Sequence, residues 1–101
     1  MKTTFEEKDG VITVVFEGRM DTKSTPEVEE DLKPLFDSES QEIVIDCSNL
    51  EYVASSGLRV LLSIAIDSQS KGKHVTIKGM NSFVSNLFEM SGFTDLFDFE
   101  H

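Results

Sequence analysis

The stretch that decides the fold is IVIDCSNLEYVASSGLRVLL, residues 43–62, which passes from a strand pattern to a helix pattern. Ile43–Cys47 is a short apolar run, as expected of a strand that is buried on both faces in a parallel sheet. We expect Ser48–Val53 to be a loop with apolar anchors, and a helix to open at Ser55-Ser56-Gly57. The apolar spacing of that helix predicts a broad buried face, formed by Leu58, Leu61, Leu62, Ala65 and Ile66 and widened by Val60 and Ile64.

The residues before this unit predict an N-terminal hairpin. Phe5–Lys8 fits a short edge strand, and Asp9-Gly10 is a two-residue turn signal. The β-branched run Val11–Glu17 predicts the second strand, which we expect Gly18 to end.

A first helix is predicted to follow the hairpin. Pro26 fits the first turn of a helix, where its missing N–H costs nothing. Ser24 has capping-box spacing with Glu27, and Thr25 is the rival N-cap. One apolar stripe carries this helix to about residue 37, formed by Val28, Leu32, Leu35 and Phe36.

The C-terminal third predicts one more strand and one more helix. Val75–Lys78 fits a strand, and Asn81 or Ser82 is the expected cap of a helix that Ser91-Gly92 breaks. The tail Phe93–Phe99 fits either a short strand or a helical turn.

These elements predict a single α/β domain over residues 1–101. Strands that are joined through helices run parallel with right-handed crossovers, and the hairpin adds an antiparallel edge. We therefore expect a mixed, mostly parallel sheet of four to five strands with helices chiefly on one side.

Charge narrows the classes of partner. The chain of 101 residues has 9 basic and 19 acidic residues and a net charge of −10, which argues against binding nucleic acid or an anionic membrane. The charge fits a basic or mixed-charge protein partner, or it only keeps the chain soluble. The N-terminus has no apolar signal core and no segment reaches the length of a membrane span, so we expect a cytoplasmic protein.

The sequence offers little for catalysis. His74 and His101 cannot form a metal cluster, and the lone Cys47 fits a small buried hydrophobic residue. There is no Gly-x-Ser-x-Gly elbow, no phosphate loop and no dinucleotide fingerprint. We expect no enzyme, no catalytic residue, no metal and no cofactor.

The stretch Asp46–Leu62 resembles the signature of anti-sigma factor antagonists and the wider STAS domain family. That signature is a strand ending in Asp, then a Ser, an apolar–x–aromatic–apolar step, and Ser-Ser/Thr-Gly-Leu opening a helix. Gly18-Arg19-Met20-Asp21 is similar to the family's Gly–x–apolar–Asp, and Val84–Phe93 is similar to its C-terminal helix and Ser-Gly turn. The resemblance covers essentially the whole chain and implies a single STAS domain.

The resemblance implies a switch in partner choice. An unphosphorylated antagonist binds an anti-sigma factor, which is an ATPase-type serine kinase, and so frees a sigma factor. The kinase then phosphorylates a serine, which matches Ser55 here, and a serine phosphatase can reset the switch. Ala54 stands where the family commonly has Asp. Other family members are docking modules in transporters or lipid-transport complexes, so a scaffold subunit without phosphorylation is the alternative function.

The residues themselves support a site at this helix start. Ser55 and Ser56 lie where a loop meets a helix, and we expect Ser56 to be the N-cap and Ser55 to be the phosphoacceptor. Gly57 either lets a partner's backbone approach or only eases the turn. The topology brings Asp21 near the end of the third strand, so we expect a partner-binding face of Asp21, Ser55, Ser56, Gly57 and Arg59 on a monomer; the other interpretation of Asp21 is a charge at a helix start.

Overall fold

One mixed sheet forms the frame of the domain. The computed structural model describes residues 1–92 and 97–100, and the strands of this part lie in the order β1-β2-β3-β4-β5. The first two strands form an antiparallel hairpin, and each later strand pairs in parallel with the one before it. The strands are β1 (Lys2–Lys8), β2 (Val11–Met20), β3 (Glu42–Val53), β4 (His74–Lys78) and β5 (Asp98–Glu100).

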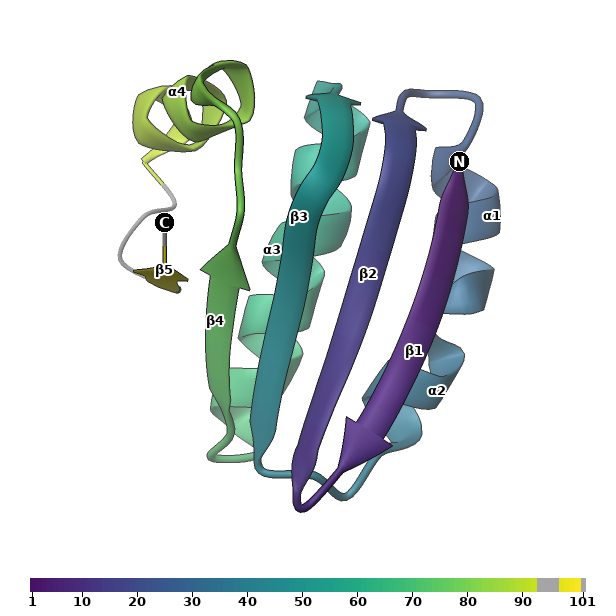
Figure 1. Ribbon diagram of the computed structural model, residues 1–101, viewed down its shortest axis with the longest axis vertical. Helices are drawn as coiled ribbons and strands as arrows, with labels where there is room; N and C mark the ends of the chain where they lie inside the picture. Colours follow the sequence, from purple (N-terminus) through teal and green to yellow (C-terminus); the bar gives the residue numbers. More distant parts are fainter. Residues whose placement is uncertain (93–96, 101) are drawn as a thin grey trace.

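The helices lie chiefly on one side of this sheet, as the sequence predicted. Figure 1 shows α1, α2 and α3 against one face, while α4 lies beyond the carboxyl end of β4. The predicted fold class is therefore confirmed. The helices are α1 (Thr25–Asp31), α2 (Lys33–Asp37), α3 (Ser55–Ser70) and α4 (Ser82–Ser91).

The central strands are covered on one face only. Along β3, Ile43, Ile45 and Cys47 are buried, while Val44 and Asp46 between them are partly exposed. The prediction of a strand buried on both faces was wrong, because α1, α2 and α3 share one face of the sheet. Burial raises the pKa of the Cys47 thiol to about 12, as expected of a residue that serves as core.

The largest differences from the predicted strand boundaries are in β1, β2 and β3. β1 begins at Lys2 rather than Phe5, and β3 continues to Val53 through the predicted loop. Gly18 does not end β2, which runs on to Met20. Gly18 has a φ of 105°, and the register with β3 shifts on either side of it, so the glycine absorbs an irregularity within the strand.

The first predicted helix is divided into α1 and α2 at Leu32. Pro34 has no N–H to donate to the carbonyl of Glu30, so it cannot continue the hydrogen-bond ladder of α1. Ser24 is at the N-cap position as predicted, but its side chain makes no capping hydrogen bond to the helix. The Ser24 hydroxyl instead accepts a hydrogen bond from the N–H of Asp21 at 3.0 Å.

The last helices agree more closely with the sequence. α3 ends at the predicted Lys71-Gly72 region, and Asn81 caps α4 by accepting a hydrogen bond from the N–H of Val84 at 2.8 Å. Ile66 was predicted to be buried, but it is 55% exposed because it lies on the outer side of α3. The tail forms the short strand β5, and its residues 93–96 lie outside the described part of the chain.

Candidate partner-binding site at the start of α3

The site begins where two parallel strands end side by side. Met20 of β2 pairs with Val53 of β3, and the N–H of Ala54 donates to the carbonyl of Met20 at 2.8 Å. Asp21 directly follows the end of β2, and Ala54 and Ser55 directly follow the end of β3. The structure thus brings Asp21 to the start of α3, as the predicted topology required.

The loop that contains Asp21 is held by a reciprocal pair of hydrogen bonds. The Ser24 N–H donates to Asp21 Oδ1 at 2.9 Å, and the Asp21 N–H donates to Ser24 Oγ at 3.0 Å. The bond from the Ser24 N–H holds the pKa of the Asp21 carboxyl below its ordinary value. This exchange has the form of a capping box, with Asp21 as the acceptor in place of the predicted Ser24.

A line of hydroxyl groups connects this loop to α3. Thr25 Oγ1 donates to the carbonyl of Asp21 at 2.8 Å and lies 3.0 Å from Ser56 Oγ. Because the Thr25 proton is already used, the Ser56 hydroxyl is the donor of the second bond. Thr25 is buried, and its contact with α3 goes beyond the capping role that its position before Pro26 predicted. No pattern in the sequence marks a contact between residues 31 positions apart.

Ser56 is therefore not the cap that the sequence predicted. The N-cap of α3 is Ala54, with extended backbone angles, and this helix start has no side-chain cap. The hydroxyl of Ser56 is turned toward α1 and is half-buried, so it holds two helices together instead.

Ser55 has the opposite environment. Its side chain is exposed, and it makes no side-chain hydrogen bond within residues 1–92 and 97–100. Its Oγ is therefore open to a reagent or partner without first breaking a bond inside the domain. The two adjacent serines thus differ both in exposure and in side-chain hydrogen bonding.

Gly57 is buried beneath this surface. A Cβ at this position would lie 2.9 Å from Met20 Sδ and 2.9 Å from Val53 Cγ1, so the first turn of α3 sits directly on the ends of β2 and β3. This close approach gives the glycine a packing role in the domain. The contact with a partner that was expected of Gly57 stays a prediction.

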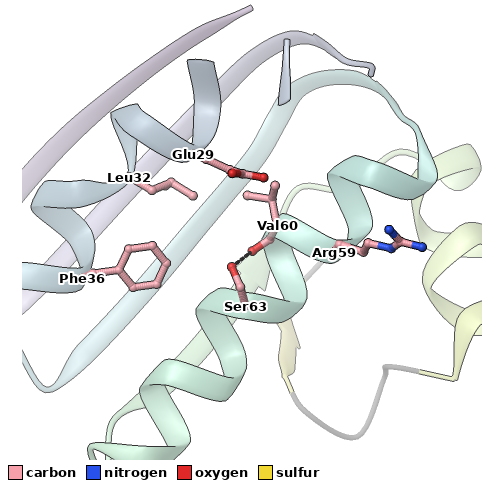
Figure 2. A pocket seen from close by; sticks show the side chains of 6 residues that line it. All are labelled: Glu29, Leu32, Phe36, Arg59, Val60 and Ser63. Atoms are coloured by element: carbon pink, nitrogen blue, oxygen red, sulfur yellow. Dashed lines mark hydrogen bonds between the residues drawn. The ribbon is translucent and has the colours of Figure 1, made fainter. Parts of the chain in front are cut away.

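Arg59 lies at the rim of a groove between α1, α2 and α3. The groove has a volume of about 420 Å³ and is lined by Glu29, Leu32, Phe36, Val60 and Ser63 as well as Arg59. Figure 2 shows the Arg59 side chain directed away from the other five, while Ser63 Oγ donates to the Val60 carbonyl at 2.6 Å. The guanidinium is thus presented on the outer surface of α3 rather than inside the groove.

The remaining polar clusters do not suggest another chemistry. His74 lies between two carboxylates, with Nδ1 3.0 Å from Glu42 Oε2 and Nε2 bonded to Asp98. No group of three or more His, Cys, Asp or Glu side chains in the described residues is arranged to hold a metal ion. The helices of these described residues are all too short or too polar to cross a membrane.

The fold is that of a small α/β domain with one mixed sheet, and comparison with known proteins gives the family. The family model described as "Mlab, STAS domain" matches residues 3–98. The chain therefore belongs to the STAS domain family, as the resemblance in the sequence indicated.

Named relatives narrow the assignment within that family. The anti-sigma-B factor antagonist of Staphylococcus aureus is 29% identical over 79 residues, which cover 78% of this chain and 73% of that protein. Such antagonists are regulatory binding proteins rather than enzymes, in agreement with the expectation from the sequence.

Solved structures support the fold. An anti-sigma factor antagonist from Mycobacterium paratuberculosis superposes with a TM-score of 0.86 at 21% identity, over 97% of this chain and 83% of that one. The Bacillus cell fate determinant SpoIIAA in its phosphorylated form gives a TM-score of 0.75 at 12% identity, over 99% and 92% of the two chains. At these identities the likeness establishes the fold alone.

Proposed function

We propose that this protein is a cytoplasmic anti-sigma factor antagonist, in which the start of α3 binds an anti-sigma factor of the ATPase-type serine kinase class. Binding sequesters that kinase and so frees a sigma factor. Phosphorylation of Ser55 ends the binding, and a serine phosphatase resets the protein, which acts as a monomer.

The observation that carries the proposal is the difference between the two adjacent serines. Ser55 is exposed and makes no side-chain hydrogen bond within the described residues, whereas Ser56 bonds to Thr25 at 3.0 Å. In the transfer step the Ser55 Oγ forms a bond to the γ-phosphorus of ATP. The bond from that phosphorus to the departing ADP oxygen breaks, and the hydroxyl proton leaves to a base of the kinase. Of these two serines, Ser55 can enter this reaction without first losing a side-chain hydrogen bond inside the domain, whereas Ser56 would have to give up its bond to Thr25.

The same surface explains how a phosphate would change binding. Asp21, Ser55, Ser56 and Arg59 lie around the joined ends of β2, β3 and the start of α3. A phosphate adds a charge of about −1.5 to −2 there, which must be desolvated when a partner docks. A change of a few kcal/mol shifts a complex by orders of magnitude, so the domain need not unfold for the switch to work.

One feature favours a second candidate, a scaffold subunit without phosphorylation. Ala54 takes the place where the family commonly has Asp, so a carboxylate that could contribute to kinase recognition is absent at the N-cap of α3. In that case the same surface docks a partner and Ser55 stays unmodified.

Incubation with the purified kinase and ATP, followed by intact-mass analysis, separates the two candidates. The switch predicts a gain of about 80 Da, one phosphate, that maps to Ser55. Ser55→Ala abolishes the gain and still binds the kinase, while Ser56→Ala, the adjacent control, remains a substrate. A kinase that binds the protein tightly but never modifies it would support the scaffold instead.

A further inference from the structure

The outer surface of α3 carries an exposed cation one turn after Ser55. Ser55 and Arg59 are separated by four positions, and both are exposed. Side chains at this spacing lie on the same face of a helix, with Cβ atoms about 5–6 Å apart. An anion on the Ser55 side chain would therefore lie within reach of the Arg59 guanidinium.

Arg59 is available for such a contact. Within residues 1–92 and 97–100 it forms no ion pair, whereas Lys2, Lys33 and Lys71 each pair with a carboxylate. Glu29 lines the same groove, but Figure 2 shows the guanidinium directed away from that carboxylate.

The same helix already contains an ion pair of this geometry. Asp67 and Lys71 are also four positions apart, with the acid nearer the N-terminus, and Lys71 Nζ lies 2.9 Å from Asp67 Oδ2. A phosphate on Ser55 and the Arg59 guanidinium would repeat this order of charges. Arginine suits the role because its planar fork can donate two parallel hydrogen bonds to a phosphate.

We propose that Arg59 binds the phosphate of phosphorylated Ser55 and so acts as the positioning residue of the modified state. The inference rests on the proposed function, because it concerns the product of the proposed phosphorylation. Before modification, Arg59 is an exposed cation of the docking surface. Afterwards it is paired within the domain, so phosphorylation both adds negative charge and withdraws a positive group from the partner.

Other charged groups near the start of α3 would also act on a phosphate at Ser55, and they are the same in every variant of Arg59. Arg19, Asp21, Lys23, Glu27 and Glu51 line one shallow depression beside the α3 start. The free N–H groups of the first helical turn also act on any anion at Ser55. A comparison of variants at Arg59 cancels these shared contributions.

The experiment installs phosphoserine at position 55 during synthesis and needs neither kinase nor partner. Phosphorus NMR follows the second ionisation of the phosphate in the otherwise unchanged protein and in Arg59→Ala, Arg59→Lys and Lys33→Ala. We expect its pKa to be about half a pH unit higher in Arg59→Ala, as for two unit charges about 5 Å apart in water. Arg59→Lys should restore part of the shift, and the remote control Lys33→Ala should match the unchanged protein.

Equal pKa values in the unchanged protein and in Arg59→Ala would overturn the inference, as would an equal shift in Lys33→Ala. Circular dichroism of each variant checks that α3 is intact. If Arg59→Ala failed to fold, the comparison with Arg59→Lys would still decide, because lysine lacks the bidentate fork and should bind the phosphate less well. Failure of the proposed function leaves a different signature: no kinase would modify Ser55, whatever the NMR result.

Discussion

The helices that follow β3 and β4 begin in opposite ways. α4 is tied into the domain, because Asn81 accepts from the N–H of Val84 at 2.8 Å and donates to the carbonyl of Leu50 at 3.2 Å. α3 begins after Ala54 with no side-chain cap, and its first residue, Ser55, is exposed.

The comparison shows that the start of α3 lacks a local stabilising interaction that the start of α4 has. A side-chain cap contributes about 1 kcal/mol to a helix, and the start of α3 forgoes it. The start of α3 is held instead by the packing of Gly57 on Met20 and Val53 and by the hydrogen bond between Ser56 and Thr25. The first turn of α3 is thus packed closely against the strand ends on its inner side, while Ser55 on its outer side remains exposed.

The largest expected effect tests that packing. Gly57→Ala places a methyl group 2.9 Å from side-chain atoms of Met20 and Val53, both of which are buried. Overpacking of this kind costs about 1–3 kcal/mol, and the better helix propensity of alanine offsets about 1 kcal/mol of it. We expect a net loss of up to about 2 kcal/mol in the free energy of unfolding, measured by urea denaturation.

Ser55→Ala is the control for this variant, since it changes the neighbouring exposed side chain and should stay within about 0.5 kcal/mol. A Gly57→Ala protein as stable as the control would show that Met20 moves aside at little cost. The start of α3 would then be held by something other than this close approach.

The second prediction removes the side-chain cap of α4 in one variant and adds a cap to α3 in another. Asn81→Ala should destabilise the protein by about 1 kcal/mol, because the N–H of Val84 loses its acceptor. Ala54→Asp should stabilise it by up to about 1 kcal/mol, because Ala54 is at the N-cap with φ −81° and ψ 171° and a carboxylate there can accept from the first turn. Thermal unfolding of both variants gives the comparison; a loss of stability in Ala54→Asp would contradict the account of an uncapped α3.

The third prediction concerns the hydroxyl line between α1 and α3. Ser56→Ala removes the donor to Thr25 Oγ1 and should cost about 0.5–1 kcal/mol, the usual net value of a half-buried hydrogen bond. A double-mutant cycle with Thr25→Val isolates the pair, since both variants lose the same contact. The contact as described requires a measurable coupling energy, and strictly additive effects would rule it out.

Much of this architecture could be predicted from local pattern. The β-branched run Val11–Glu17 and the apolar spacing of α3 indicated their elements, and Asn81 signalled the start of α4. The length of β3 could not be predicted from local pattern. Past Cys47 its burial no longer alternates, so Ser48–Val53 has the composition of a loop while its backbone continues to pair with β2.

The candidate site was predictable in its location but not in its bonding. The hydroxyls in Ala54-Ser55-Ser56-Gly57 suggested a cap, which is the common use of serine at a helix start. Ser56 instead bonds to Thr25, and Gly57 packs on Met20. Both contacts depend on how the loop after β2 folds over the end of β3, which residue spacing within one element does not encode.

The smallest expected effect lies at the edge formed by β4 and β5, where polar groups are paired within the domain as they are at α4. His74 bridges Glu42 of β3 and Asp98 of β5, and the hydrogen bond to Asp98, followed by that to Glu42, raises the pKa of His74 above its ordinary value of 6.5. A raised pKa in the folded state means that the protonated ring stabilises the fold. That contribution is fully present below pH 6.5 and is lost as the pH rises through the folded-state pKa. Because the His74 side chain is 51% exposed, we expect the protonated ring to contribute less than about 1 kcal/mol to the free energy of unfolding.

The variant His74→Gln tests this contribution. The difference in the free energy of unfolding between the protein and His74→Gln should be largest near pH 6 and vanish by about pH 9. Urea denaturation at both pH values measures it, with Lys33→Ala as a surface control that should show no such trend. A stability difference that grew with pH would mean that the neutral ring is the stabilising form. The contacts of His74 with Glu42 and Asp98 would then not stabilise the fold as charged pairs, and this edge of the sheet would lack the paired polar groups that distinguish it from the start of α3.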